Sequence, residues 1–91
     1  MRYHATRRFD RSVERLDPER KARVTITIDR LVAAFETGQL QQGLGLTQLR
    51  QGLWELRASL SDRILFLRTG DLVEFLLVGN HDEIKRFLKS P

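Results

Sequence analysis

The sequence predicts an α+β fold, in which an N-terminal helical hairpin and a C-terminal helix pack on a small, mainly antiparallel sheet of four to five strands. Two observations lead to this expectation. Apolar residues recur at helical spacing in the first part of the chain, and their period changes to that of strands beyond the glycine-containing loop at residues 41–45. Farther on, Gly70-Asp71 separates two apolar runs, as a two-residue hairpin loop does. With 91 residues and no linker, residues 1–91 are expected to form one domain.

The first helix is predicted just behind the N-terminus. Thr6 is a suitable N-cap, because its hydroxyl can accept a hydrogen bond from the first turn. Phe9, Val13 and Leu16 follow at helical spacing and form an apolar stripe. The helix is expected to end before Pro18, since proline disfavours a helical residue ahead of it.

The second helix is predicted to begin at Asp17-Pro18, with Asp17 as N-cap and proline at the first helical position. Residues 24–28 alternate β-branched side chains as a strand would, but helical spacing continues through Ile28, Leu31 and Phe35. We therefore expect a helix that ends at Gly38. The two helices would form an antiparallel hairpin with one arginine-rich face.

Four later segments have the composition of strands, and they are predicted to form an antiparallel meander. They are residues 46–49, 53–58, 63–69 and 72–79. Pairing Thr69 with Leu72 across the turn places Phe66 opposite Phe75. The last two strands are apolar on both faces at their centres, so a helix must cover the second face.

The C-terminal segment is the candidate for that cover. Asn80 can cap a helix, and Glu83 stands at the spacing of a capping box. Ile84, Phe87 and Leu88 then supply an apolar stripe.

Charge and composition limit the functional class. The net charge is +4 and the isoelectric point is near 10.3, with arginine dominating the cations. This favours a polyanionic partner such as RNA or DNA, or an acidic protein; a basic surface that is only solvated is the alternative. The chain has no cysteine, no apolar run long enough to span a membrane and no signal peptide, so we expect a soluble, cytoplasmic protein without disulfides or a thiolate metal site.

Candidate chemistry lies on the predicted strand at residues 53–58. Alternation places Glu55 and Arg57 on one face, beside Leu53. A carboxylate next to an arginine can accept a proton, and the arginine can hold a phosphate oxygen. An exposed ion pair with no function would look the same in sequence. Arg63 joins this face only if the loop at residues 59–62 brings it opposite Arg57, because a shift of one residue moves it to the other face.

The two histidines are the remaining candidates for proton transfer. His81 falls in the first turn of the C-terminal helix, where the helix dipole disfavours the protonated ring, so a largely neutral imidazole can give or take a proton. A histidine that only contacts solvent is the alternative. His4 lies near the terminus and has no acid, base or arginine of assignable geometry nearby.

Taken in order, the segments LWELR at residues 53–57, DRILF at residues 62–66 and LLVGNHDE at residues 76–83 resemble the RelE/ParE superfamily of toxins, and the resemblance covers nearly the whole chain. It implies an N-terminal strand, a helical hairpin and the sheet described above. It also implies a cognate acidic antitoxin as partner. In the mRNA-cleaving branch of the superfamily, the resemblance implies cleavage of messenger RNA on the ribosome without a metal or other cofactor.

By this resemblance, Glu55 would act as general base, Arg57 and Arg63 would hold the phosphate, and His81 would protonate the leaving oxygen, although the acid and base roles are exchangeable. The RNA-binding residues would be Arg50, Lys85 and Phe87. Phe87 stands where many members have a tyrosine, and a phenylalanine can stack but cannot transfer a proton. Two alternatives remain open: a ParE-like inhibitor that binds DNA gyrase without cleaving RNA, and an inactive remnant that binds an antitoxin.

Overall fold

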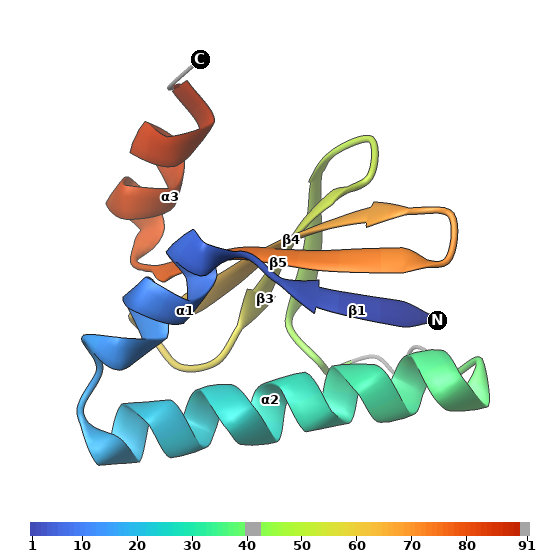
Figure 1. The fold of residues 1–91 in the computed structure, drawn as a ribbon, viewed down its shortest axis with the longest axis horizontal. Coiled ribbons are helices and arrows are strands. Elements are labelled where there is room, and N and C mark those ends of the chain that lie inside the picture. Colours follow the sequence, from blue (N-terminus) through green and yellow to red (C-terminus); the bar gives the residue numbers. More distant parts are fainter. Residues whose placement is uncertain (40–42, 90–91) are drawn as a thin grey trace.

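The computed structural model describes residues 1–39 and 43–89, and these form a five-stranded sheet with three helices (Figure 1). In chain order the elements are β1 (Arg2–Ala5), α1 (Arg7–Glu14), α2 (Pro18–Thr37), β2 (Leu46–Arg50), β3 (Leu53–Arg57), β4 (Arg63–Thr69), β5 (Leu72–Gly79) and α3 (His81–Lys89). The α+β prediction and the strand assignments are confirmed, with ends that differ by one residue at β2 and β3. Part of the predicted loop at residues 41–45, namely residues 41 and 42, lies outside the described residues.

The sheet has the strand order β1-β5-β4-β3-β2. Strands β2 to β5 form the predicted antiparallel meander, and β1 pairs with β5 in parallel. The sheet is therefore mainly antiparallel. Among the described residues, no helix is both long enough and apolar enough to cross a membrane.

The helix ends follow the predicted capping residues. Thr6 Oγ1 accepts a hydrogen bond from Phe9 N, and Asp17 Oδ1 accepts one from Arg20 N. Residues 24–28 belong to α2, so the helical spacing outweighs their β-branched side chains. Gly38 ends α2 with a φ of 70°, a left-handed conformation that glycine adopts without a steric penalty.

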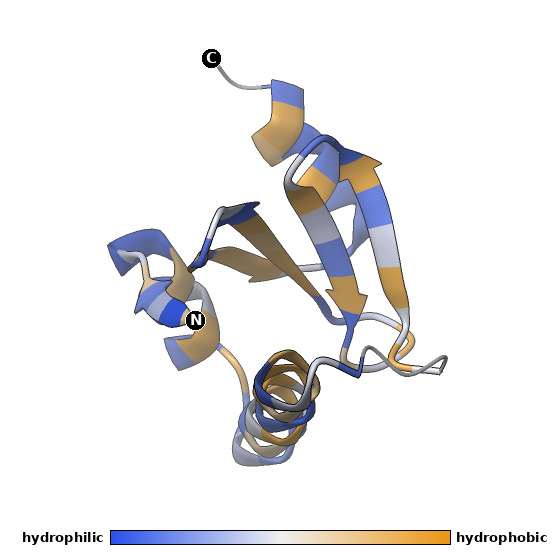
Figure 2. Ribbon diagram, turned by 90° about the vertical axis from the view of Figure 1, so that its right-hand side faces the viewer, coloured by the Kyte–Doolittle hydropathy of each residue, from blue (hydrophilic) through white to orange (hydrophobic). Residues whose placement is uncertain are grey.

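The two faces of the sheet have separate apolar clusters. On one face α2 contributes Val24 and Leu31 to a cluster that includes Phe66 of β4. On the other face Ile84 of α3 packs with Leu53, Leu65 and Leu77. Figure 2, which looks along α2, shows α2 and α3 on opposite sides of the sheet. The predicted role of the C-terminal helix as cover for the second face is confirmed.

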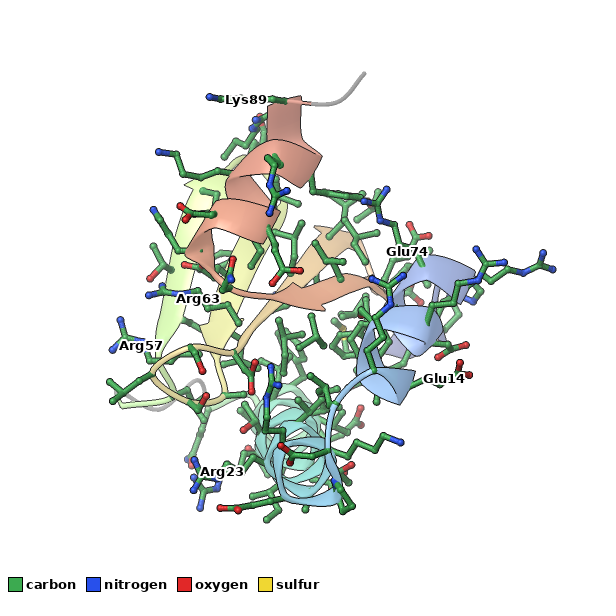
Figure 3. The ribbon with its side chains drawn as sticks, turned by 90° about the vertical axis from the view of Figure 1, so that its left-hand side faces the viewer. Glu14, Arg23, Arg57, Arg63, Glu74 and Lys89 are labelled. Carbon is green, nitrogen blue, oxygen red and sulfur yellow. The ribbon has the colours of Figure 1, made fainter. Side chains whose placement is uncertain are left out.

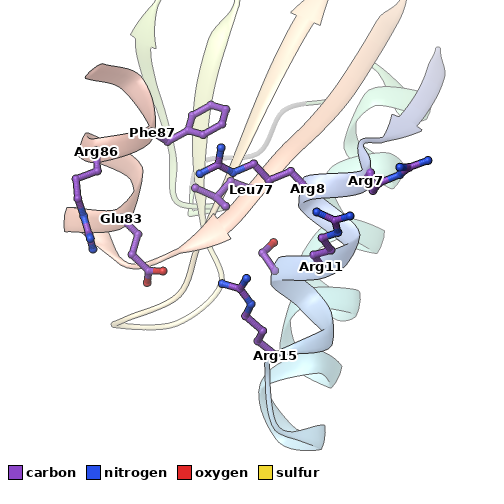
Figure 4. A pocket seen from close by; sticks show the side chains of 9 residues that line it. Arg7, Arg8, Arg11, Arg15, Leu77, Glu83, Arg86 and Phe87 are labelled. Carbon is purple, nitrogen blue, oxygen red and sulfur yellow. The ribbon is translucent and has the colours of Figure 1, made fainter. Parts of the chain in front are cut away.

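Helix α1 is followed directly by α2, as in the predicted helical hairpin. It packs mainly on β5, where Thr6 at its start donates to Phe75 O and Ser12 Oγ accepts from Val78 N. The arginine-rich face predicted for the hairpin lies on α1, and Figure 4 shows Arg8 and Arg15 of this helix extending toward α3. The predicted pair of N-terminal helices is therefore present, and α1 takes its position mainly from its packing on β5.

Strands β4 and β5 pair as predicted near the turn, with Thr69 opposite Leu72 and Phe66 opposite Phe75. A bulge then follows, because Leu65 pairs with Leu77 and Leu76 is left without a partner. The bulge shifts the register by one residue. As a result Arg63, at the far end of β4, lies opposite Gly79 at the end of β5.

Candidate functional site

A buried ion pair lies at the end of the sheet where β3 finishes and β4 begins. Glu55 of β3 is only 7% exposed, and its Oε2 accepts a hydrogen bond of 3.2 Å from Arg63 Nη1. The guanidinium supplies the counter-charge that a buried carboxylate requires. Arg63 Nε is buried too, but it has no hydrogen-bond partner within the part of the chain that the structure describes. The free protein thus leaves one donor of this arginine unused.

Arg57 lies directly opposite Arg63 in the β3–β4 ladder, which is the register that the sequence left open. Directly opposite residues share a face of the sheet, so Arg57 and Arg63 lie on the side covered by α3, together with Glu55. Figure 3 shows the two arginines at the same edge of the molecule. Arg57 is exposed, and its backbone N–H donates to Gly45 O at 3.1 Å. Two like charges in this position repel each other unless an anion lies near them.

The loop between β3 and β4 is held by Asp62, which is 2% exposed. Its carboxylate accepts hydrogen bonds of 2.9 Å and 2.6 Å from Arg20 of α2. These bonds hold the pKa of Asp62 below its ordinary value of 3.8, although desolvation opposes the shift. Asp62 O also accepts from Ala58 N, and Asp62 N donates to Ser59 Oγ. The loop that leads into Arg63 is therefore held by local hydrogen bonds and also by Arg20 of α2, a contact that is distant in sequence.

His81 is the first residue of α3, two positions after Gly79, and its side chain is exposed. Gly79 pairs with Arg63, so α3, which starts at His81, begins at the same end of the sheet as the Glu55–Arg63 pair. The start of α3 is well defined, because Asn80 Oδ1 accepts from Glu83 N and Glu83 Oε1 accepts from Asn80 N. A Cβ on Gly79 would lie 3.0 Å from Glu83 Cβ, so the glycine allows this turn to approach β5 closely.

The other predicted residues are more scattered. Arg50 lies opposite Leu53, at the opposite end of β3 from Arg57, and Lys85 is exposed on α3. The ring of Phe87 lies under the guanidinium of Arg8, 4.7 Å from ring centroid to Cζ, and so faces α1. His4 lies on β1 opposite Glu74. The structure does not bring Arg50 or Phe87 to the Glu55–Arg63 pair, and their proposed contact with RNA stays a prediction.

One end of the sheet thus brings together a carboxylate and two arginines, and α3 begins with His81 at the same end. The arginines can hold an anion whose charge increases during a reaction, and the carboxylate and imidazole can move protons. Asp62 and Arg20 were missed by sequence reasoning. The only sequence signal for them is an acidic residue directly ahead of Arg63, and its partner is 42 residues away.

A second feature is a groove between α1 and α3 with a volume of about 680 Å³. Its lining is dominated by arginine, together with Ser12, Leu77, Glu83 and Phe87; the arginines are Arg7, Arg8, Arg11, Arg15 and Arg86 (Figure 4). The helical spacing of the α1 arginines was visible in the sequence. Their position against α3 was not, since it depends on how both helices pack on β5.

No family model matches the chain, and no curated protein is similar to it in sequence. Solved structures are similar in fold. The RelB–RelE antitoxin–toxin complex from Methanococcus jannaschii matches with a TM-score of 0.71 at 14% identity, covering 92% of this chain and 96% of that one. YafQ from E. coli matches with a TM-score of 0.66 at 12% identity, covering 92% and 98%. A YoeB/ParE toxin from Agrobacterium tumefaciens matches with a TM-score of 0.64 at 21% identity, covering 89% and 99%. The chain therefore has the fold of the RelE/ParE-type toxins.

Proposed function

We propose that this chain is the toxin of a toxin–antitoxin pair and that it cleaves messenger RNA on the ribosome without a metal. The observation that carries the proposal is the arrangement of Glu55, Arg57 and Arg63 on one face of the sheet. Glu55 contacts Arg63, and Arg57 lies directly opposite Arg63. Fold alone does not determine function. The similar structures with toxin names support the class of protein, and the residues at this end of the sheet support the chemistry.

In the proposed step, Glu55 takes the proton of a ribose 2'-hydroxyl, and the 2'-oxygen forms a bond to the adjacent phosphorus. The bond from phosphorus to the 5'-oxygen breaks, and His81, as the imidazolium, gives that oxygen its proton. Arg57 and Arg63 hold the phosphate, whose negative charge increases as the bonds exchange. The products are a 2',3'-cyclic phosphate and a 5'-hydroxyl end.

The ion pair sets a condition on this step. Glu55 cannot act as base while Arg63 holds it in the geometry of the free protein, so the bound phosphate must draw Arg63 toward itself. A phosphate can compete for the guanidinium because it offers a bidentate partner. The step therefore requires that substrate binding, rather than a change of pH, releases the carboxylate.

The test is cleavage of a defined message on programmed ribosomes by the purified protein, with the ends of the products identified. We expect cyclic-phosphate ends, and a rate lower by about a hundredfold or more for Glu55→Gln and for His81→Gln. Arg30→Gln on α2 is the matched surface control and should cleave at the wild-type rate. Products with 5'-phosphate ends would contradict the proposed 2'-hydroxyl attack.

Two observations favour the gyrase-binding alternative. Glu55 is buried and already neutralised by Arg63, and Phe87 contacts Arg8 rather than the Glu55–Arg63 pair. An end of the sheet closed in this way suits a protein that acts by binding alone. A supercoiling assay with purified gyrase separates the two: inhibition of gyrase by a protein that leaves messages intact on ribosomes would favour the alternative.

We also propose an acidic antitoxin as the partner. The net charge of +4 supports it, and so does the similar RelE structure, which is a complex with the antitoxin RelB. Binding of an acidic partner to a basic surface should weaken as the salt concentration rises. Growth arrest on expression, relieved by co-expression of a small acidic protein encoded beside the toxin, would support this partner.

A further inference from the structure

We infer that the groove between α1 and α3, here called the arginine groove, is a docking site for an acidic, amphipathic segment of a partner protein. The groove is defined by the residues named above for its lining. This assignment rests on the proposed acidic partner for the identity of the occupant. It does not rest on the cleavage activity, since the residues of the groove are not those of the Glu55–Arg63 end of the sheet.

The arginines of the groove that lie on α1 destabilise the free protein electrostatically. Arg7, Arg11 and Arg15 follow one another at intervals of four residues along α1, an arrangement in which like charges repel. Arg7 and Arg8 also stand at the N-terminal end of α1, where the helix dipole disfavours cations. Among the described residues, no carboxylate forms an ion pair with any of these arginines of α1. An anionic partner would remove these unfavourable terms.

The apolar part of the groove lining indicates which kind of partner fits. Leu77 and the half-buried Phe87 give it an apolar surface between the arginines. Ser12 contributes no free polar group, because its hydroxyl donates to Phe9 O and accepts from Val78 N. A protein segment with acidic residues at its edges and an apolar side chain at its centre matches this pattern.

RNA matches it less well. Single-stranded RNA binds proteins by stacking its bases on open aromatic rings beside cations that contact phosphates. The ring of Phe87 already has Arg8 over it at 4.7 Å, so that ring face is occupied within the protein itself. The volume of about 680 Å³ accommodates several side chains of a peptide.

Helix α3 stands between the arginine groove and the Glu55–Arg63 pair. Figure 3 shows Arg63 on one side of the base of α3 and α1 on the other. The same helix begins with His81 and packs Ile84 against the sheet. A segment seated in the groove would therefore contact the helix that carries His81 without covering the Glu55–Arg63 pair itself.

The test measures binding of a fluorescent amphipathic peptide with glutamates at its edges and leucines at its centre, by anisotropy. The comparison peptide has glutamine in place of every glutamate, and single-stranded oligouridylate of similar charge is a second probe. The groove variant is Arg11→Gln with Arg15→Gln. Its control, Arg23→Gln with Arg30→Gln, removes the same charge from α2.

We expect the glutamate peptide to bind the wild type more tightly than the glutamine peptide. The groove variant should weaken its affinity on the order of tenfold, while the control variant changes it by less than about twofold. Equal losses in both variants would show that only net charge matters and would overturn the inference. So would oligouridylate that binds in the groove in place of the peptide. A lysine peptide that gains affinity for Arg11→Glu with Arg15→Glu would add support that is independent of fold stability.

These measurements need neither ribosomes nor catalysis. An inactive protein that binds the glutamate peptide in the groove would contradict the proposed cleavage and leave the docking site standing. A protein that cleaves messages but does not bind the peptide would contradict the docking site and leave the proposed cleavage standing.

Discussion

Replacing Asp62 with asparagine tests how the loop between β3 and β4 is held. The carboxylate is 2% exposed and accepts two hydrogen bonds from the guanidinium of Arg20, at 2.9 Å and 2.6 Å. The asparagine side chain would keep the volume but lose the charge and one acceptor. Hydrogen bonds to charged groups contribute roughly 1.5–3 kcal/mol each, and breaking a fully buried ion pair costs about 3–5 kcal/mol. The side chain of Arg20 is 46% exposed, so water can solvate it after the substitution.

The expected loss is therefore about 2 kcal/mol in the free energy of unfolding, below the range for a fully buried pair. Asp71→Asn is the matched control, because Asp71 also pairs with one arginine, Arg2, but both side chains are more than half exposed. That substitution should cost clearly less than Asp62→Asn, because water screens an exposed ion pair. Urea unfolding followed by circular dichroism measures both. Equal losses for the two variants would refute the reasoning that burial makes Asp62 the stronger support.

Lowering the pH should remove the stabilisation that the Asp62 carboxylate provides. The pKa of Asp62 is lower in the folded protein than its ordinary value of 3.8, because Arg20 stabilises the carboxylate. The unfolded chain therefore binds the proton more readily, and the stabilisation is present above pH 3.8 and lost as the pH falls through the folded value. The difference in stability between the wild type and Asp62→Asn should shrink in that window. A difference that stays constant on acidification would contradict the assignment.

Three further outcomes follow from local geometry. Gly52→Ala should cost about 1–3 kcal/mol, because φ is +79° and the new Cβ would lie 2.9 Å from a backbone oxygen; Gly38→Ala, with nothing near its Cβ, should cost less in the same urea assay. Asn80→Ala should cost about 1 kcal/mol and increase hydrogen exchange in the first turn of α3, since the cap of that helix is lost. Tyr3, the only tyrosine, has its pKa raised to about 12 by desolvation and by its hydrogen bond to Glu36. Its folded form holds the proton more tightly, so this stabilisation is present below pH 10 and lost as the pH rises toward 12, and a phenolate absorbance midpoint near 10 in the folded protein would contradict it.

Much of the fold was predictable because its signals are local. The caps at Thr6, Asp17 and Asn80 depend on residues three positions away, and each forms the predicted hydrogen bond. The turn at Gly70-Asp71 fixes the nearby pairing of Phe66 with Phe75 in the same way. Local chemistry was sufficient wherever the partners are close in sequence.

The remaining features depend on contacts that are distant in sequence. The bulge at Leu76 moves Gly79 opposite Arg63, and nothing in the apolar run of β5 marks it. Arg63 lies opposite Arg57, and the loop ahead of it is held in part by the bond between Asp62 and Arg20 of α2, which are far apart in sequence. Alternation correctly placed Glu55 and Arg57 on one face, but it could not show that Glu55 is buried against Arg63.

Phe87 shows the same limit on a helix. Its spacing with Ile84 correctly predicted an apolar stripe. The stripe does not say which other neighbours each residue has, and Phe87 also contacts Arg8 of α1. That contact depends on the angle between α1 and α3, which both helices take from their packing on the sheet.

The most direct test of the proposed chemistry is the single-turnover rate of message cleavage on programmed ribosomes for the wild type and Arg63→Ala. The variant leaves Glu55 buried without its counter-charge, so circular dichroism must first show that it is folded at the assay temperature. If Arg63 serves the charge that develops on the phosphate, the rate should fall by about a hundredfold or more. A folded Arg63→Ala protein that cleaves as fast as the wild type, or a wild type that cleaves no message, would contradict the account.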